Sequence, residues 1–267
     1  MRIFRSGVRK LIRRPATWLT FGLLAGLLAL IMIAVGATAG QGEGDPDEAA
    51  ALALVTFPTA YEGILGFIIG LGGLFAVIYG AAIAGSEWSW GTLKVAVARG
   101  ESRSRYLLGS FASVAILIAV GLLFAFGVGV GAALVGAAMA GVPTDGIGDA
   151  DALARLPEQF ARGWFATVEE GALGFAVATL ARSQLAGIGA GIAFYFAETF
   201  ATIFLPDIVK YLPFHVANTA VGLGDGFGDG SDVAALSQET AMLLVAAWLI
   251  GLLVVAAAFA ERAEITG

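Results

Sequence analysis

The sequence predicts an all-α, polytopic membrane protein. Of its 267 residues, 58% are hydrophobic and 13% are charged, whereas an ordinary soluble domain has roughly 45–50% apolar and about 25% charged residues. A soluble surface needs far more charge than this chain supplies. The apolar residues also form several runs long enough to cross a bilayer. Together these observations argue against a water-soluble globular fold.

Six apolar segments are predicted to cross the membrane. A hydrocarbon core about 30 Å thick is crossed by about 20 helical residues, so each segment is assigned as one span of a single transmembrane domain over residues 1–267. The six spans are 18–36, 61–84, 106–130, 164–181, 185–205 and 242–260. The third run stays apolar as far as Met139. We therefore expect this helix to extend beyond the bilayer or to bend at its glycines, and an unusually long helix inside a protein bundle fits equally well.

Basic residues gather on one side of the predicted membrane. With a cytoplasmic N-terminus, twelve of the fifteen Lys and Arg residues fall in cytoplasmic segments, and only Arg155, Arg162 and Lys210 lie outside. The twelve are Arg2, Arg5, Arg9, Lys10, Arg13, Arg14, Lys94, Arg99, Arg103, Arg105, Arg182 and Arg262. Cytoplasmic loops of membrane proteins carry such an excess. We therefore expect a multi-pass protein of the cell membrane with both termini in the cytoplasm.

Residues 1–16 are predicted to form an amphipathic helix that lies at the cytoplasmic interface. Its apolar residues recur at helical spacing and its arginines occupy another face. Pro15 is expected to start the helix of the first span. Two alternatives stay open for this region: a basic flank that only fixes topology, and a cleaved signal peptide ending near residues 37–39, where Ala-Thr-Ala has the small-residue pattern of a cleavage site.

Glycines at four-residue spacing predict close packing of the spans. Transmembrane helices associate through close backbone contact, which small residues allow. The pairs are Gly22 and Gly26, Gly66 and Gly70, Gly127 and Gly131, and Gly187 and Gly191. Together they favour a compact helical bundle.

The connection between the second and third spans, residues 86–105, is the most informative segment. It reads SEWSWGTLKVAVARGESRSR, which is too polar to lie in lipid. Residues 92–98 are predicted to form a short helix between Gly91 and Gly100, since glycine commonly ends a helix. Three apolar residues of this helix need a surface to cover them, so we expect a cytoplasmic partner. They are Leu93, Val95 and Val97.

An ordered set of residues in this segment resembles the permease subunits of the type-2 ATP-binding-cassette (ABC) transporter family. An acidic residue leaves the second span, and Gly-Thr-Leu, a short apolar helix and a Ser-Arg pair follow before the third span. The matching residues are Glu87, Gly91, Thr92, Leu93, Ser102 and Arg103. Arg99 and Gly100, at the end of the short helix, complete the expected coupling set. A generic positively charged loop is the alternative, and it would need the basic residues but not this order.

The resemblance implies a fold and a mechanism. The short helix would fit a groove on a separate cytoplasmic ATPase subunit, and that subunit would bind ATP and Mg²⁺. Two permease subunits, identical or homologous, would form the pathway between them, with no cofactor in this chain. Export is the implied direction. The chain departs from many relatives, which carry a basic residue early in the third span where it has Leu108, Gly109 and Ser110.

Residue counts exclude several chemistries. Cys is absent and His215 is the single histidine, so thiolate chemistry and a multi-histidine metal centre are excluded. No G-x-x-x-x-G-K-S/T loop occurs to hold phosphates, so the chain is not expected to hydrolyse ATP alone. The expected partners are the ATPase subunits, a second permease and membrane lipids, and no nucleic acid.

Three glutamates lie inside predicted spans: Glu169 and Glu170 in the fourth and Glu198 in the fifth. An acidic residue at the bilayer centre costs roughly 2.5–3.5 kcal/mol, so these carboxylates must face protein or water. Their positions indicate a shared depth in the outer half, where adjacent spans could bring them together. Three roles stay open: satisfying buried polar groups at a helix contact, lining a cavity for cationic or amphipathic cargo, and relaying protons.

Residues 206–240 form the predicted outer segment. The part around Pro213 is expected to be a short helix at or dipping into the outer interface, as the family resemblance implies, and the part around Asp225 and Asp229 an acidic turn. A calcium loop does not fit these aspartates, because the bidentate Glu that ends such a loop is missing.

Two other functions stay open besides a permease subunit. One is a self-sufficient ion-coupled carrier or channel that uses the three glutamates. The other is a non-transporting membrane scaffold or sensor that binds a partner through residues 86–105.

Overall fold

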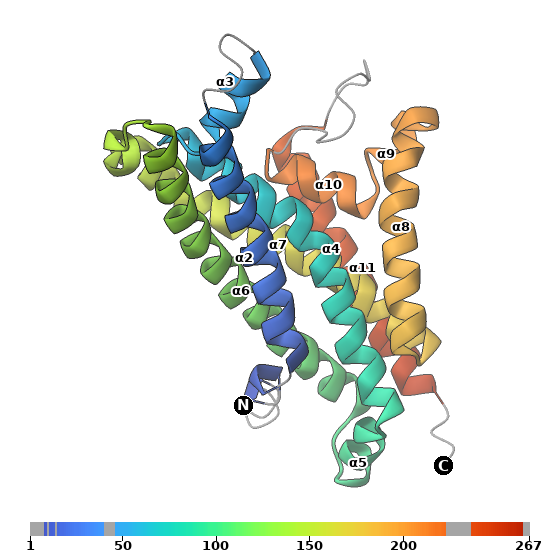
Figure 1. The fold of residues 1–267 in the computed structure, drawn as a ribbon. Helices are drawn as coiled ribbons and strands as arrows, with labels where there is room; N and C mark the ends of the chain where they lie inside the picture. Colours follow the sequence, from blue (N-terminus) through green and yellow to red (C-terminus); the bar gives the residue numbers. More distant parts are fainter. Residues whose placement is uncertain (1–7, 10, 14, 40–45, 223–235, 264–267) are drawn as a thin grey trace.

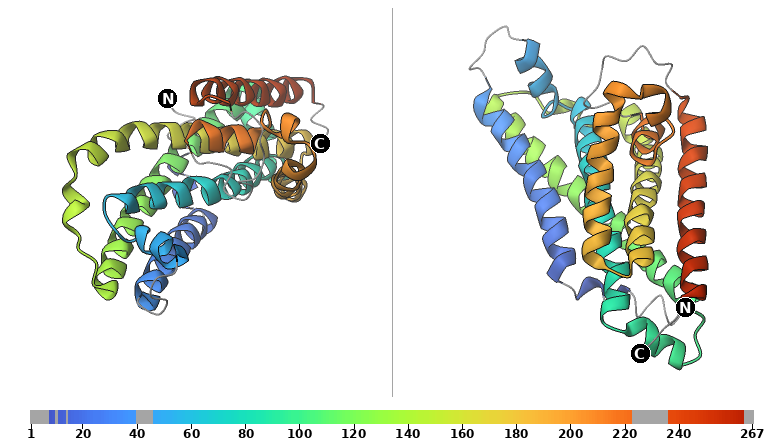
Figure 2. Two further views of the ribbon diagram at one scale, coloured as in Figure 1. Left: turned by 90° about the horizontal axis from the view of Figure 1, so that it is seen from above. Right: turned by 90° about the vertical axis from the view of Figure 1, so that its right-hand side faces the viewer.

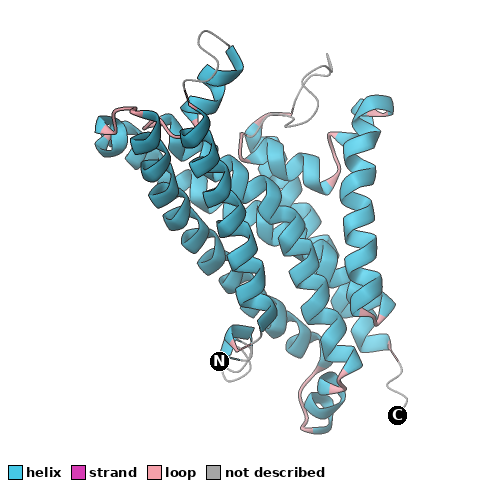
Figure 3. Ribbon diagram, in the orientation of Figure 1, coloured by secondary structure: helices cyan, strands magenta, loops and turns pink. Residues whose placement is uncertain are grey.

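Long apolar helices dominate the structure. The computed structural model describes residues 8–9, 11–13, 15–39, 46–222 and 236–263, and within these ranges every regular element is helical (Figure 3). The elements are α2 (Pro15–Thr38), α3 (Pro46–Ala53), α4 (Thr59–Ser89), α5 (Thr92–Ala98), α6 (Arg103–Ala140), the 3₁₀ turn η1 (Asp145–Gly148), α7 (Ala150–Ala181), α8 (Gln184–Phe204), α9 (Pro206–Val209), α10 (Pro213–Ala220) and α11 (Gln238–Arg262). The predicted all-α class is confirmed.

Five of these helices are long and apolar enough to cross a membrane: α2, α4, α6, α8 and α11. The chain is therefore a multi-pass membrane protein. The sixth predicted span, residues 164–181, is helical and forms the second half of α7, but α7 is not among the five. Glu169 and Glu170 lie in this half and lower its hydropathy. A sixth crossing stays a prediction.

The third apolar run forms one uninterrupted helix. α6 has 38 residues and continues through all its glycines. At 1.5 Å per residue it is roughly 57 Å long, which exceeds a hydrocarbon core about 30 Å thick. The glycines do not interrupt the helix, and its extension beyond the bilayer stays a prediction. The helix ends at Gly141, whose φ of +69° suits a residue without a Cβ.

The helices share two common ends (Figures 1 and 2). The α5 end contains α5, the first turn of α2 and the last turn of α11, and the α3 end contains α3 and α9. Six of the predicted cytoplasmic basic residues lie within or next to helix termini at the α5 end: Lys94, Arg99, Arg103, Arg105, Arg182 and Arg262. The charge pattern of the sequence therefore corresponds to one physical end of the bundle.

α7 lies at the centre of the bundle. It packs most extensively against α4 and also contacts α6, α8, α10 and α11, whereas α2 packs mainly along α6 (Figure 2). The residue numbers of the contacting pairs rise together along the two helices, from Gly163 of α7 beside Ile69 of α4 to Gly174 beside Val77. These two helices therefore run parallel.

Glycines set how closely α4 and α7 approach. A Cβ at Gly174 would overlap the backbone carbonyl of Val77, and a Cβ at Gly80 would overlap that of Gly171. Small residues at such positions let transmembrane backbones touch. The contact between α4 and α7 is thus one of backbone against backbone.

One predicted glycine pair packs inside the chain. Gly187 lies against Ala178 of α7, and Gly191 lies against the side chain of Val77. At five members of the other pairs, an added Cβ would meet no atom within 4 Å. These five are Gly22, Gly26, Gly70, Gly127 and Gly131. Spacing alone therefore did not identify the contacts.

Residues before α2 are described only in part. Residues 8–9 and 11–12 are helical, and the rest of the predicted interfacial helix over 1–16 falls largely outside the described residues. Leu11 is buried, and its carbonyl accepts a hydrogen bond from the Thr17 hydroxyl at 2.8 Å. Pro15 begins α2 as predicted.

The glycine contact predicts a stability effect. Gly174→Ala should lower the free energy of unfolding by about 1–3 kcal/mol, because the added methyl group overpacks the interface with α4. Gly70→Ala is the matched control, since its Cβ would meet no atom within 4 Å. The thermal stability of both variants is measured as the fraction of monodisperse protein that remains after heating in detergent. Equal thermal stability of the two would contradict the packing described.

Candidate functional site

Two glycines shape the α5 segment. α4 ends at Ser89, the chain turns through Gly91 at a φ of +64°, and α5 then runs over Thr92–Ala98. Gly100, with a φ of +87°, follows α5 before α6 begins at Arg103. Positive φ is readily adopted only by glycine. The short helix predicted over 92–98 is confirmed, and it projects past the long helices at the α5 end (Figure 1).

Glu87 holds α5 against the bundle. Its buried carboxylate accepts hydrogen bonds from the Thr92 hydroxyl of α5 and, at 2.7 Å, from the Tyr106 hydroxyl of α6. A buried carboxylate needs such donors, and bonds to a charged acceptor are stronger than neutral ones. Glu87 and Thr92, predicted as coupling residues, are thus internal groups that fix the position of α5.

The apolar side chains of α5 divide into a covered and an exposed set. Leu93 is only 1% exposed, because α5 packs against α4 and α6. The expectation that Leu93 needs a partner surface was wrong, since the chain itself covers it. Val95 is 51% exposed and Trp90, just before α5, is 64% exposed.

We define the α5 face as Trp90, Lys94, Val95 and Arg99. All four residues are exposed. The face combines two large apolar side chains with two cations, on a helix whose other side is fixed to the bundle. It is an exposed part of the predicted coupling segment.

Arg103 ties two helices together at the α5 end. Its guanidinium donates to the carbonyl oxygens of Ala260, Glu261 and Ala263, at the end of α11. In return, the Glu261 carboxylate accepts the backbone N–H of Ser104, in the first turn of α6, at 2.9 Å. A cation at a helix C-terminus and an anion at an N-terminus are both favourable. Arg103 was predicted as a coupling residue, and the structure gives its guanidinium an internal role. Ser102 is exposed and makes no side-chain cap.

A cation–π cluster beside α5 was missed from the sequence. The Arg182 guanidinium lies 5.3 Å from the ring centroid of Trp88 and 5.5 Å from that of Phe259. Arg182 lies at the α7–α8 corner with a φ of +51°, and the two rings come from the ends of α4 and α11. The only sequence signal was a single arginine between two predicted spans.

The three glutamates predicted inside spans are all buried and come together. Glu169 and Glu170 lie on α7 and Glu198 on α8, and each is less than 5% exposed. Their charges are near enough to interact with one another. The Glu170 carboxylate lies against Gly73 of α4, where a Cβ would overlap it. The expectation that adjacent helices bring these residues together is confirmed.

Glu198 differs from the other two in having partners. Its carboxylate accepts the backbone N–H groups of Phe214 and His215, in the first turn of α10. It therefore caps that helix from α8, which is one of the three roles predicted for the glutamates. Both carboxylate oxygens of Glu169 and one of Glu170 are buried without a hydrogen-bond partner in the described part of the chain. Capping does not explain those two side chains.

The first part of the predicted outer segment folds into the bundle. α9 and α10 are short helices, and α10 packs against α7 and α11 with Phe214, Val216 and Ala217 buried. The short helix expected near Pro213 is confirmed. The acidic turn expected around Asp225 and Asp229 lies outside the described residues.

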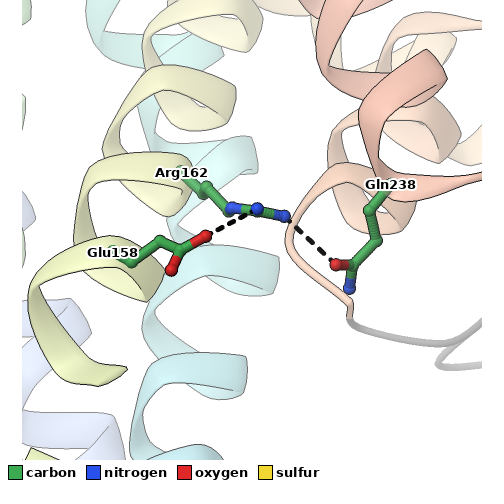
Figure 4. A network of polar contacts seen from close by, with 3 residues as sticks. All are labelled: Glu158, Arg162 and Gln238. Carbon is green, nitrogen blue, oxygen red and sulfur yellow. Dashed lines mark hydrogen bonds and ion pairs between the residues drawn. The ribbon is translucent and has the colours of Figure 1, made fainter. Parts of the chain in front are cut away.

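A polar network joins α7 to the start of α11 at the α3 end (Figure 4). Arg162 lies 2.6 Å from the Glu158 carboxylate and donates to the Gln238 side chain at 3.1 Å. Both charged side chains are partly exposed, so the pair contributes little to stability. Its effect is to orient the first turn of α11.

An apolar groove of about 480 Å³ lies between α6 and α7. It is lined by Ala119, Leu123, Phe126, Leu156, Pro157, Phe160, Ala161 and Trp164. The Trp164 indole closes one side by donating to the carbonyl of Ala115 at 2.8 Å. No glutamate lines this groove, so it is separate from the buried carboxylates.

Comparison with known families gives a match to a family of unknown function. The family described as "Protein of unknown function (DUF2705)" matches residues 50–262. The chain belongs to this family. The matched region begins within α3 and ends at the last residue of α11, so it includes both the α5 segment and the three buried glutamates. No curated protein matches the sequence.

The role of Arg103 can be tested directly. Arg103→Gln should loosen the last turn of α11, because hydrogen bonds to a charged group contribute about 1.5–3 kcal/mol. Hydrogen exchange of residues 258–263 should become faster, while Arg105→Gln, which alters an exposed cation two residues away, should leave it unchanged. The same exchange rates in both variants would show that Arg103 does not hold α11.

Proposed function

We propose that this chain is the transmembrane permease subunit of an ATP-driven transporter of the type-2 ABC class, driven by a separate cytoplasmic ATPase. The observation that carries the proposal is α5, a short helix fixed outside the bundle with an exposed face of mixed apolar and cationic residues. The ATPase would bind ATP and Mg²⁺ and would dock on this face. The order of residues from Glu87 to Arg103 resembles that of such permeases.

The composition of the α5 face supports docking. Aromatic and arginine side chains dominate the binding energy of protein interfaces, and the face holds Trp90 and Arg99 beside Val95. Large apolar side chains that stay exposed at the end of a bundle are often covered by a partner. Lys94 and Arg99 would complement an acidic rim on that partner.

The anchoring of α5 supports its use as a lever. Glu87 joins α5 to α4 through Thr92 and to α6 through Tyr106, so a displacement of α5 moves both helices. Arg182 then connects the end of α4 to the α7–α8 corner and to α11. The glycine contact between α4 and α7 continues this connection to the helix that carries Glu169 and Glu170.

The proposed topology has six crossings with both termini cytoplasmic. The α5 end would face the cytoplasm, in agreement with its basic residues and the positive-inside rule. α7 would be the sixth crossing. Its polar residues do not prevent this, because residues 166–176 are buried by neighbouring helices and are kept from lipid.

A second permease subunit and lipid would cover the outer faces. α2, α8 and α11 expose large apolar side chains along their length, including Leu23, Phe200 and Ile250. We propose that two such subunits, identical or homologous, form the pathway and that the direction is export. The direction rests on the family resemblance.

A carrier driven by an ion gradient is the second candidate function. It is supported by Glu169, whose two carboxylate oxygens have no partner within the described residues, since buried ionisable side chains often form ion or proton paths. The two functions differ in their energy source. A carrier would move substrate without ATP.

The topology can be tested by cysteine labelling, because the natural chain has no cysteine. Gly148→Cys, before α7, should react with a membrane-impermeant maleimide applied outside intact cells. Gln184→Cys, after α7, should react only once the membrane is permeabilised. Labelling of both from the same side would show that α7 does not cross.

Docking can be tested by purifying the tagged chain from its native membranes. ATPases that co-purify are identified by their phosphate-binding loop and by ATP hydrolysis in the eluate. Val95→Asp should reduce their recovery about tenfold, because a charge at the centre of an interface costs 1.4 kcal/mol or more. Ile147→Asp, at an exposed apolar residue of η1, is the control. Full recovery with Val95→Asp, or no ATPase with the unaltered chain, would contradict the proposal.

A further inference from the structure

We propose that Glu169 and Glu170, with the aromatic side chains of α8 and α10 beside them, form a binding site for an organic cation. The proposal rests on the proposed transport function and names the chemical class of its substrate: a positively charged, partly apolar molecule. It assigns these two glutamates a role that the capping by Glu198 does not supply.

The first evidence is the lack of partners at Glu169. This side chain is 0% exposed, and neither of its carboxylate oxygens accepts a hydrogen bond from the described residues. One oxygen of Glu170 is in the same state. Buried polar groups in native proteins nearly always have a partner, so unsatisfied oxygens of this kind need an explanation. A ligand that is absent from the structure would satisfy them.

The second evidence is the sign of the local charge. The carboxylates of Glu169, Glu170 and Glu198 interact with one another, and no Lys or Arg side chain in the described ranges forms an ion pair with any of them. His215 of α10 donates its backbone N–H to the Glu198 carboxylate. Carboxylates in a membrane interior are strongly stabilised by a cation. In their ionised form, these carboxylates therefore lack a positive partner among the described residues.

The third evidence is the ring cluster beside the carboxylates. The rings of Tyr195 of α8 and Phe214 of α10 meet edge to face, with their centroids 4.9 Å apart. The ring centroids of Phe194 and Phe214 lie 6.2 Å apart. Tyr195 is near enough to Glu170 for an electrostatic interaction. Aromatic faces attract organic cations, and such rings beside a carboxylate are a common way to bind them. They also provide an apolar surface that a small hydrated ion would not need.

A metal ion fits the cluster less well than an organic cation. Within the described part of the chain, no three acidic or histidine side chains are arranged to hold a metal ion. A molecule with a distributed charge can span separated carboxylates and contact the rings at the same time. The arrangement therefore selects a larger cation.

Access to the site requires α8 to move. Glu169 is fully covered, whereas α8 has only three buried residues, Gly187, Gly191 and Glu198. α8 is thus held along one narrow side, near its start by the two glycines and further along by Glu198. α8 packs against both α4 and α7, so its separation from these two helices would expose the carboxylates together with the Tyr195 ring.

The test measures binding to the purified chain without any ATPase. Radiolabelled tetraphenylphosphonium is titrated onto the protein in nanodiscs, and tetraphenylborate, of the same size and opposite charge, is the matched ligand. Saturable binding of the cation alone is expected. The variant Glu169→Gln/Glu170→Gln should bind it at least tenfold more weakly, while Glu62→Gln, which alters an exposed acid of α4, should bind as the unaltered chain does.

A second variant keeps the test decisive if the double variant does not fold. Tyr195→Leu removes a ring that is partly exposed and should weaken tetraphenylphosphonium binding about threefold to tenfold, as expected for the loss of a cation–π contact. Before binding is measured, the thermal stability of each variant is compared with that of the unaltered chain.

Four results would overturn the proposal. The first is the absence of saturable tetraphenylphosphonium binding, and the second is that tetraphenylborate binds as tightly as tetraphenylphosphonium. The third is that folded variants of Glu169, Glu170 or Tyr195 bind tetraphenylphosphonium as tightly as the unaltered chain does. Uptake of protons without binding of the cation also counts against it. Because no ATPase is present, these results leave the proposed coupling through α5 untouched, and loss of ATPase docking would leave the cation site untouched.

Discussion

The backbone contact between α4 and α7 is the constraint on which the rest of the bundle depends. Gly80 and Gly174 leave no space for a side chain at this contact, so the two helices touch along their backbones. This contact buries the half of α7 that is too polar to face lipid. α8, α10 and α11 then pack around α7, and the position of every buried carboxylate in these helices follows from that arrangement.

Polar side chains inside this apolar chain mostly serve to position helices. Glu87 holds α5, Glu198 caps α10, and Arg103 joins the end of α11 to the start of α6. In each case a charged group meets backbone ends or hydroxyl groups that would otherwise lack a partner. Glu169 is the exception, because its carboxylate positions nothing in the described chain. That contrast, rather than burial alone, distinguishes it as a functional candidate.

Much of the fold followed from local sequence properties. Apolar runs of sufficient length identified the long helices, and Gly91 and Gly100 identified α5 because a positive φ is a local requirement. The contacts of Leu93 and Arg103 could not be predicted in this way. They depend on which helix faces meet: Arg103 reaches carbonyls at the far end of the chain, and glycine spacing shows which helices can approach closely but not which of them do.

The length of α6 has a consequence for the surrounding membrane. Exposed apolar side chains extend along it from Leu108 to Met139, a greater distance than the thickness of a hydrocarbon core. A helix of this kind is accommodated partly by tilting, and in Figure 1 α6 runs obliquely to α8. Even a tilt of about 40° leaves the apolar stretch longer than a hydrocarbon core about 30 Å thick. The remainder needs a locally thicker bilayer or a protein surface that covers it.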